Sequence, residues 1–319
     1  MKILFVTATR VGDAVLSTGL LSHLTDQYPA ARFTIVAGPD AAPLFEDVPG
    51  LERLISLPKQ RWSAHWLTLY RTVALQRWDM VVDLRASALA YLLWTRERRV
   101  AEAGRRNEHR VKQLARIFAL DPPPSPRLAI APRREAEAAR LVPPGNPVIA
   151  IGPAANWRGK EWRAERFAEL ATRLIAQDGM VPGARVVVMA AAHERAQAMP
   201  LINALPAPRC IDLVGKVDLL TAAAVLRRCG IFIGNDTGLM HLAAAAGTPT
   251  LGLFGPSPVE QYAPWGTHTA TVSTAIAYRD LIPPDFNRFT TDTLMDSLSV
   301  DAVEAGARGL WARIAGKAA

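Results

Sequence analysis

Cysteines, long apolar runs and metal-ligand spacings are all scarce in this chain of 319 residues. The two cysteines, Cys210 and Cys229, have neither redox nor metal-ligand spacing, so we expect reduced core residues of a cytosolic protein. No segment has the run of about 20 apolar residues that a membrane-spanning helix needs. Arg10 and Asp13 interrupt the apolar N-terminus, which argues against a signal peptide. These absences indicate a globular cytosolic protein.

Several catalytic motifs are absent as well. No GxGxxG motif occurs, which counts against a dinucleotide-dependent oxidoreductase. No Ser-His-Asp arrangement of the GxSxG type found in serine hydrolases is evident, and the histidines are scattered along the chain. No His/Cys cluster has metal-ligand spacing, and no paired acidic motif is placed to hold a metal-bound diphosphate. We therefore expect neither a bound metal nor a cofactor.

The net charge of +8 lies almost entirely in the first half of the chain. Residues 1–145 hold 21 Lys and Arg against 14 Asp and Glu, whereas residues 146–319 hold 16 against 15. The excess peaks in Arg96–Arg116, with eight basic residues against three acidic ones. Two interpretations stay open: a solvated helix face, or a surface for an anionic partner such as a phosphorylated glycolipid or membrane headgroups. Aromatic residues are not interleaved with this run, so nucleic acid is the weakest candidate partner.

Short apolar runs alternate with helix-like segments along most of the chain, which predicts an α/β protein with parallel sheets. The expected strands are Ile3–Thr7, Phe33–Ala37, Met80–Leu84, Val148–Gly152, Val186–Ala190, Ile211–Leu213, Ile231–Gly234 and Thr250–Phe254. Two proline-rich stretches, Asp121–Arg127 and Val142–Pro147, interrupt the alternation. We place a domain boundary in the second of them, which gives domains 1–145 and 146–319. The last stretch, Val300–Ile314, has helical spacing and suits packing on either domain.

The most informative motif is Gly234–Ala245, where a strand ends, a short polar loop turns and an alanine-rich helix begins. The unpaired N–H groups at such a helix start favour a diphosphate. Thr237, Gly238 and His241 lie where they would contact that anion, and Asp236 suits the hydroxyls of an attached sugar. Ordinary N-capping by Asp236 or Thr237 is the alternative.

Two further residues follow strands at the same kind of position. Lys160 lies in the loop after Val148–Gly152, at the carboxyl end of a strand, where ligands of open α/β sheets collect. Asp13 follows the first strand and opens a helix, where its carboxylate is placed to take a proton from an attacking hydroxyl. A role for Asp13 as the helix N-cap is equally consistent with the sequence.

The chain resembles glycosyltransferase family 9, the bacterial lipopolysaccharide heptosyltransferases. The resemblance rests on GDAVLSTGLL, GPAANWRGKEW, LVGKVDLLTAAAVLRRC and, most specifically, IFIGNDTGLMHLAAAAGTPTLGLFGPSP. It implies a GT-B fold, with two Rossmann-like domains facing across a cleft. It also implies an inverting, metal-independent transfer of heptose from ADP-heptose to a lipopolysaccharide core. A sugar-nucleotide epimerase of the same architecture and a non-catalytic nucleotide- or glycolipid-binding protein are the alternatives.

The resemblance also implies roles for individual residues. Asp13 matches the general base; Lys160, Thr237, Gly238 and His241 match the groups that bind the donor phosphates; Asp236 matches the residue that binds the donor sugar; and Glu194 and Val217 match the nucleoside site. We expect Arg10, Arg98, Arg105 and Arg106 to bind the anionic glycolipid acceptor, with the protein in the cytoplasm or peripheral on the inner membrane surface. Ala155 and Asn156 stand where the family often has hydroxyl residues, and Ala275–Thr291 departs from the family's usual pattern.

Overall fold

The computed structural model describes residues 1–102, 108–282, 286–287 and 289–318. The chain divides into two compact units, Met1–Ala131 and Pro132–Ala319. The division falls before α5 (Pro132–Leu141), earlier than the predicted boundary at 142–147, because α5 packs on α8 (Leu219–Leu226) of the second unit.

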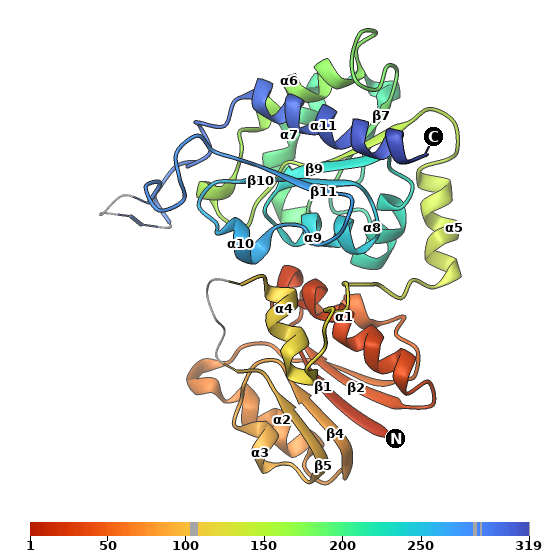
Figure 1. The fold of residues 1–319 in the computed structure, drawn as a ribbon, viewed down its shortest axis with the longest axis vertical. Helices are drawn as coiled ribbons and strands as arrows, with labels where there is room; N and C mark the ends of the chain where they lie inside the picture. Colours follow the sequence, from red (N-terminus) through yellow and green to blue (C-terminus); the bar gives the residue numbers. More distant parts are fainter. Residues whose placement is uncertain (103–107, 283–285, 288, 319) are drawn as a thin grey trace. The chain divides into compact units, whose positions relative to one another are not determined.

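The first unit is a parallel α/β sheet (Figure 1). Its elements are β1 (Lys2–Val6), α1 (Val11–Gln27), β2 (Arg32–Ala37), η1 (Ala42–Phe45), β3 (Leu51–Ser56), η2 (Arg61–Ser63), α2 (His65–Val73), β4 (Trp78–Asp83), α3 (Leu89–Leu92), β5 (Thr95–Val100), α4 (Arg110–Ala115) and η3 (Arg116–Phe118). In the described residues the strand order is β3-β2-β1-β4-β5, and every pairing is parallel. The chain therefore starts in the middle of the sheet, builds to one edge, and returns to the other side of β1.

Burial explains why the central strands form. In β1 the sequence ILFV is fully buried, which is typical of a parallel strand covered by helices on both faces. One face carries a core cluster to which α2 contributes Leu69 and α3 contributes Leu89, packed with Leu4 and Val81 of the sheet. Burying each such side chain contributes about 1.5–3 kcal/mol to folding.

The second unit is also a parallel α/β sheet. Its remaining elements are β6 (Val148–Gly152), η4 (Arg158–Lys160), α6 (Ala164–Ile175), β7 (Arg185–Val188), η5 (Ala192–Glu194), α7 (Arg195–Ala204), η6 (Ala207–Arg209), β8 (Cys210–Asp212), β9 (Ile231–Asn235), α9 (Gly238–Ala245), β10 (Thr250–Phe254), α10 (Val259–Tyr262), β11 (Thr269–Ser273) and α11 (Val300–Ala318). The described strands run β11-β10-β9-β6-β7-β8, again all parallel. This is the strand order of a doubly wound nucleotide-binding sheet, in which the first strand, β6, lies beside the fourth, β9.

The last helix belongs to the second unit. Helix α11 packs on α6, β10 and β11, and its residues Val303, Ala307 and Leu310 are buried in that unit's core. The predicted C-terminal helix therefore packs within the second unit. Among the helices of the described residues, none is both long and apolar enough to cross a membrane.

Candidate functional site

The candidate donor site lies at the carboxyl ends of β6 and β9. These neighbouring strands are the point where the second sheet changes direction, because β7 and β8 extend to one side and β10 and β11 to the other. In open α/β sheets the loops that leave such a point diverge and form the ligand crevice. The loop after β6 carries Lys160, and the loop after β9 carries Asp236 and leads into α9.

Two facing glycines allow these strands to approach closely at their carboxyl ends. Gly152 of β6 is paired with Gly234 of β9. A Cβ atom at Gly234 would lie 2.7 Å from the Phe232 ring and 2.8 Å from the carbonyl oxygen of Gly152. Packing therefore requires glycine at position 234, and the starts of the loops after β6 and β9 are held at a fixed distance from each other.

Lys160, Asp236 and His241 come together at this point. The Lys160 Nζ lies 2.6 Å from Asp236 Oδ2, in an ion pair whose side chains are 22% and 7% exposed. The Nε2 atom of His241 lies 3.8 Å from the other carboxylate oxygen, Oδ1, and the His241 side chain is 4% exposed. One buried carboxylate is thus shared between a lysine and a histidine that the sequence placed 81 positions apart.

The N-terminus of α9 adds backbone donors to this cluster. Thr237 is the N-cap residue, has extended backbone angles and makes no side-chain capping hydrogen bond, so capping does not explain its hydroxyl. Gly238 opens the helix, and both residues are partly exposed. The first N–H groups of a helix have no intrahelical acceptor and carry partial positive charge. Three of the predicted phosphate-binding residues, Thr237, Gly238 and His241, therefore lie at one helix terminus.

Asn235 is a residue of this site that the sequence analysis did not assign. It is fully buried, and its Oδ1 accepts a hydrogen bond from the Trp162 N–H at 3.1 Å. Its Nδ2 donates to the carbonyl oxygens of Pro153 at 2.8 Å and Ala154 at 3.4 Å. One amide therefore fastens both ends of the Lys160 loop to the loop after β9. The Asn-Asp pair that ends the strand was the available signal for this role.

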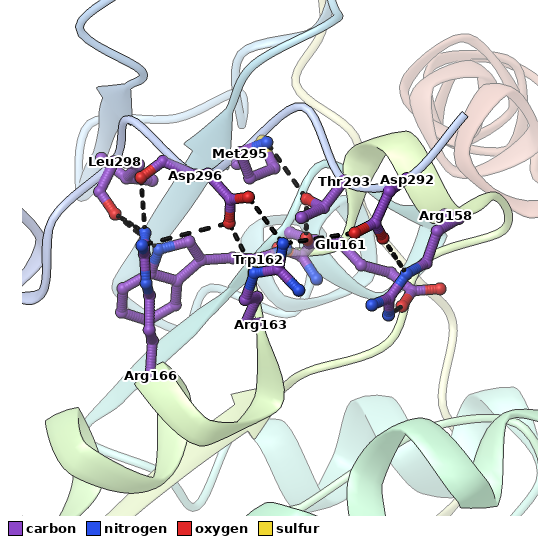
Figure 2. Close-up of polar contacts among 11 residues, drawn as sticks. Arg158, Glu161, Trp162, Arg163, Arg166, Asp292, Thr293, Met295, Asp296 and Leu298 are labelled. Carbon is purple, nitrogen blue, oxygen red and sulfur yellow. Dashed lines mark hydrogen bonds and ion pairs between the residues drawn. The ribbon is translucent and has the colours of Figure 1, made fainter.

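A second support for the Lys160 loop comes from residues 292–298, which we call the C-terminal strap. Figure 2 shows these residues lying along residues 158–166, with ion pairs and backbone hydrogen bonds between the two segments. Arg158 pairs with the nearly buried Glu161 at 2.7 Å and with Asp292 of the strap at 2.8 Å. Burial raises the pKa of Glu161 above its usual range, although the hydrogen bond and charge of Arg158 act in the opposite direction.

The predicted nucleoside residues lie in adjacent turns. Glu194 ends η5, and its Oε2 accepts a hydrogen bond from the Ala191 N–H at 2.9 Å. Val217 is partly exposed in the turn between β8 and α8. Gly215 of that turn has φ of +68°, and a Cβ there would lie 2.7 Å from Cα of Ala192, so the two turns are in contact. Both turns follow neighbouring parallel strands of one sheet, β7 and β8, so both lie at the carboxyl-end edge where we expect the nucleoside.

In the first unit, Asp13 lies in the first turn of α1, and its side chain is partly exposed. The N-cap residue of α1 is Arg10, without a side-chain capping hydrogen bond, so Asp13 is not the N-cap. A carboxylate at this position is stabilised by the helix macrodipole. Since β1 and β4 flank the point where the first sheet changes direction, Asp13 occupies the equivalent ligand-collecting position of that sheet.

Asp83 and Arg85 also lie at this edge, after β4, and the sequence analysis did not identify them. Asp83 is fully buried; it accepts hydrogen bonds from the N–H groups of Arg85 and Ser87 and from the Ser87 hydroxyl. It therefore shapes the loop that presents Arg85, whose guanidinium stacks 4.4 Å from the Trp66 ring centroid. The strand-final aspartate in MVVDL was the signal for this turn.

The structure describes two of the four predicted acceptor-binding arginines, and these two lie on different elements. Arg10 is exposed at the start of α1. Arg98 lies on the edge strand β5, donates to the carbonyl oxygens of Ala90 and Leu93, and stacks over Tyr91. Arg105 and Arg106 lie outside the described residues. In its described residues the charge run Arg96–Arg116 begins in strand β5 and later enters helix α4 (Arg110–Ala115), so the run is not one helix face.

Within the residues that the structure describes, no group of three or more His, Cys, Asp and Glu side chains is arranged to hold a metal ion.

Comparison with known proteins identifies the family of the chain. Residues 83–281 match the model of glycosyltransferase family 9 (heptosyltransferase). The lipooligosaccharide heptosyltransferase 2 of Haemophilus influenzae is 26% identical over 310 residues, covering 85% of this chain and 88% of that protein.

Solved structures show the same fold. The Escherichia coli ADP-heptose lipopolysaccharide heptosyltransferase II aligns with a TM-score of 0.74 at 20% identity, covering 98% of this chain and 99% of that one. The iron-containing dodecameric glycosyltransferase TibC from enterotoxigenic E. coli aligns with a TM-score of 0.59 at 14% identity, covering 98% of this chain and 76% of that one. The predicted GT-B fold is confirmed. Because the family model matches more than half of this chain, the chain belongs to glycosyltransferase family 9 and is a glycosyltransferase related to the heptosyltransferases of lipopolysaccharide biosynthesis.

Proposed function

We propose that this enzyme transfers heptose from ADP-heptose to a lipopolysaccharide core by a single inverting displacement that needs no metal. The observation that carries the proposal is the pairing of Lys160 with Asp236 beside His241 at the start of α9. The choice of donor is supported by the name of the E. coli relative of the same fold, an ADP-heptose heptosyltransferase.

Stabilisation of the leaving group is proposed to come from charges and dipoles held at the start of α9. As the bond between the sugar and the diphosphate breaks, negative charge grows on the leaving phosphate. In this proposal the Lys160 ammonium, the His241 imidazole, the Thr237 hydroxyl and the N–H groups at the start of α9 receive that charge; Lys160 and His241 already lie beside the same carboxylate, that of Asp236. Preorganised donors of this kind are usually the largest contribution to catalysis, because they need no rearrangement as the charge develops. In this proposal they take the part that a metal ion plays in other transferases.

Asp236 has a different role because a carboxylate repels phosphate. With no donor bound, it balances Lys160 within a site where its own side chain is only 7% exposed. With donor bound, we propose that its oxygens accept hydrogen bonds from the sugar hydroxyls, while Lys160 turns to the diphosphate. Glu194 and Val217 would border the nucleoside in the adjacent turns.

Asp13 is the proposed general base. An inverting displacement needs a base that takes the proton from the acceptor hydroxyl as it attacks the anomeric carbon from the face opposite the leaving group. Asp13 is partly exposed, so its carboxylate is accessible, and it opens α1 at the ligand-collecting edge of the first sheet. The acceptor we propose is an anionic glycolipid at the inner membrane surface, attracted by the excess positive charge of residues 1–145.

Nucleotide binding tests the donor class. We expect ADP to raise the melting temperature in the presence of EDTA, with UDP, GDP and dTDP giving smaller shifts, because a ligand that binds only the folded state stabilises it. A Lys160→Met variant should lose most of this shift. A preference for another base would move the donor away from ADP-heptose, and a strict requirement for a divalent cation would contradict metal independence.

Transfer itself tests the base. Asp13→Asn keeps the size of the side chain but removes its basicity, so turnover should fall about 100-fold or more while ADP affinity stays near that of the wild type. Asp26→Asn is the matched control: the same chemical change on the same helix, at an exposed residue that pairs with Arg127. Equal turnover in Asp13→Asn and the wild type would end the general-base assignment.

A further inference from the structure

The two carbonyl groups that flank Lys160 are both held by the C-terminal strap. The Leu294 N–H donates to the carbonyl oxygen of Gly159 at 3.0 Å, and the Thr293 hydroxyl donates to the carbonyl oxygen of Glu161. These contacts join parts of the chain that are more than 130 positions apart, since Thr293 and Glu161 are separated by 132 residues. The backbone of Lys160 is thus fixed on both sides by one short segment.

The strap is itself firmly anchored. Met295 and Leu298 are each 1% exposed and belong to the core of the second unit. The Trp162 Nε1–H donates to the carbonyl oxygen of Leu298 at 2.8 Å, which closes the contact from the other side. The strap is therefore held by the core of the second unit independently of its contacts with the Lys160 loop.

Thr293 is the central contact of this arrangement. Its side chain is buried, with the residue 8% exposed, and its oxygen accepts a hydrogen bond from the Met295 N–H at 3.1 Å while its proton goes to the Glu161 carbonyl. The accepted bond fixes the direction of the donated one. Around it lie more exposed ion pairs, among them Arg163 with Asp296 at 2.6 Å (Figure 2), and exposed pairs of this kind are individually weak.

We infer that the C-terminal strap, through Thr293, is a positioning device that sets where the Lys160 ammonium meets the donor diphosphate. This inference rests on the role proposed above for Lys160. A lysine is a point charge on a flexible four-carbon stem, so its backbone must be fixed for its Nζ to be placed accurately. A misplacement of about 1 Å is enough to lower a rate by as much as about 100-fold. Thr293 touches no substrate in this scheme and acts only through Lys160.

The first test measures the loop directly and needs no activity. Thr293→Val keeps the shape of the side chain but removes the hydroxyl, and Thr293→Ser keeps the hydroxyl. Asp296→Asn changes the strap at its exposed ion pair with Arg163, outside residues 157–162, and leaves the Thr293 and Leu294 contacts in place. Hydrogen–deuterium exchange of the peptide covering residues 157–162 should quicken in Thr293→Val and stay near the wild-type rate in the other two variants. Unchanged exchange in Thr293→Val overturns the inference, and so does equal quickening in Asp296→Asn.

The second test is a double-mutant cycle in binding of the nucleoside diphosphate that stabilises the wild type most, with Kd measured by calorimetry. Thr293→Val should weaken binding about 10-fold or more when Lys160 is present, and less than about twofold in the Lys160→Met background, because coupled residues are non-additive. Thr293→Ser should restore wild-type affinity. If Lys160→Met weakens binding but the effect of Thr293→Val is the same in both backgrounds, the positioning inference fails alone. If Lys160→Met binds like the wild type, the proposed role of Lys160 fails, and the inference falls with it.

Discussion

Replacing Asn235 with leucine should damage both the stability and the donor site of the second unit. The Asn235 amide is fully buried and bonds to three backbone groups of the Lys160 loop: the N–H of Trp162 and the carbonyl oxygens of Pro153 and Ala154. Leucine has a similar volume, so the substitution leaves little cavity. It removes the hydrogen bonds and leaves their partners in an apolar site.

The magnitude follows from the groups left without partners. The bonds to Trp162 at 3.1 Å and Pro153 at 2.8 Å are well formed, whereas the contact with Ala154 at 3.4 Å is long and adds little. Each buried backbone group that loses its partner costs about 1–3 kcal/mol, which gives about 2–6 kcal/mol for the two. A loss near the middle of that range lowers the melting temperature by roughly 8–16 °C for a unit of this size.

The assay combines differential scanning calorimetry with nucleoside diphosphate affinity measured well below the melting temperature. Thr250→Val is the matched control: Thr250 is also fully buried, and its hydroxyl donates to the Thr248 carbonyl at 2.7 Å at the amino end of β10, away from the site. That variant should lose about 1 kcal/mol and keep its nucleotide affinity. Asn235→Leu should lose affinity as well as stability. The reasoning is refuted if Asn235→Leu is no less stable than Thr250→Val, or if its nucleotide affinity equals that of the wild type.

Two further predictions concern titrating groups outside the site. Burial alone would raise the pKa of Asp212, but hydrogen bonds from Arg195, from Lys216 and from a backbone N–H outweigh it and lower the pKa to about 2. Because the pKa of Asp212 in the folded state is below the ordinary 3.8, its carboxylate stabilises the fold fully above pH 3.8, and this stabilisation is lost as the pH falls through about 2. In urea unfolding, the difference in unfolding free energy between the wild type and Asp212→Asn should be about half as large at pH 3 as at pH 7. A difference that does not change with pH would contradict this. Burial raises the pKa of Cys229 to about 12, so at pH 8 a thiol reagent should modify it only after unfolding, as read by peptide mass spectrometry. Labelling of Cys229 in the native protein before the partly exposed Cys210 would contradict the burial of the Cys229 thiol.

The strands predicted from the sequence are the buried ones together with the partly buried edge strand β8, and the strands that were missed all lie at sheet edges. Central strands such as β1 and β9 read as continuous apolar runs because helices cover both of their faces. The edge strands β3, β5 and β11 were not predicted. They carry charged or partly exposed residues, as in TRERRV of β5, and this is how proteins discourage edge-to-edge pairing. Local pattern cannot distinguish such a strand from a charged loop or helix face, because only its neighbour in the sheet defines it.

The candidate site divides in the same way. Lys160 and Asp236 were predictable because each follows a recognisable buried strand, and parallel strands bring their carboxyl ends to one edge. Asn235 and Thr293 were not, since their value depends on backbone groups far away in sequence: Trp162 for the first and Glu161 for the second. The strap has no apolar periodicity, so its sequence gives no sign that it supports the loop.

The proposed metal independence and the C-terminal strap are connected by a physical requirement. A magnesium ion places itself, because it binds phosphate oxygens at about 2.0–2.1 Å with a strict octahedral preference, and a few carboxylates are enough to hold it. A lysine has no such geometry of its own, so a site that replaces the ion with Lys160 must obtain the same accuracy from the surrounding protein. Asn235 fastens the ends of the Lys160 loop, and Thr293 fastens its middle. The loss of nucleotide affinity on replacing either residue, beyond what the same change costs in a Lys160→Met background, therefore measures how far the site depends on the placement of that lysine.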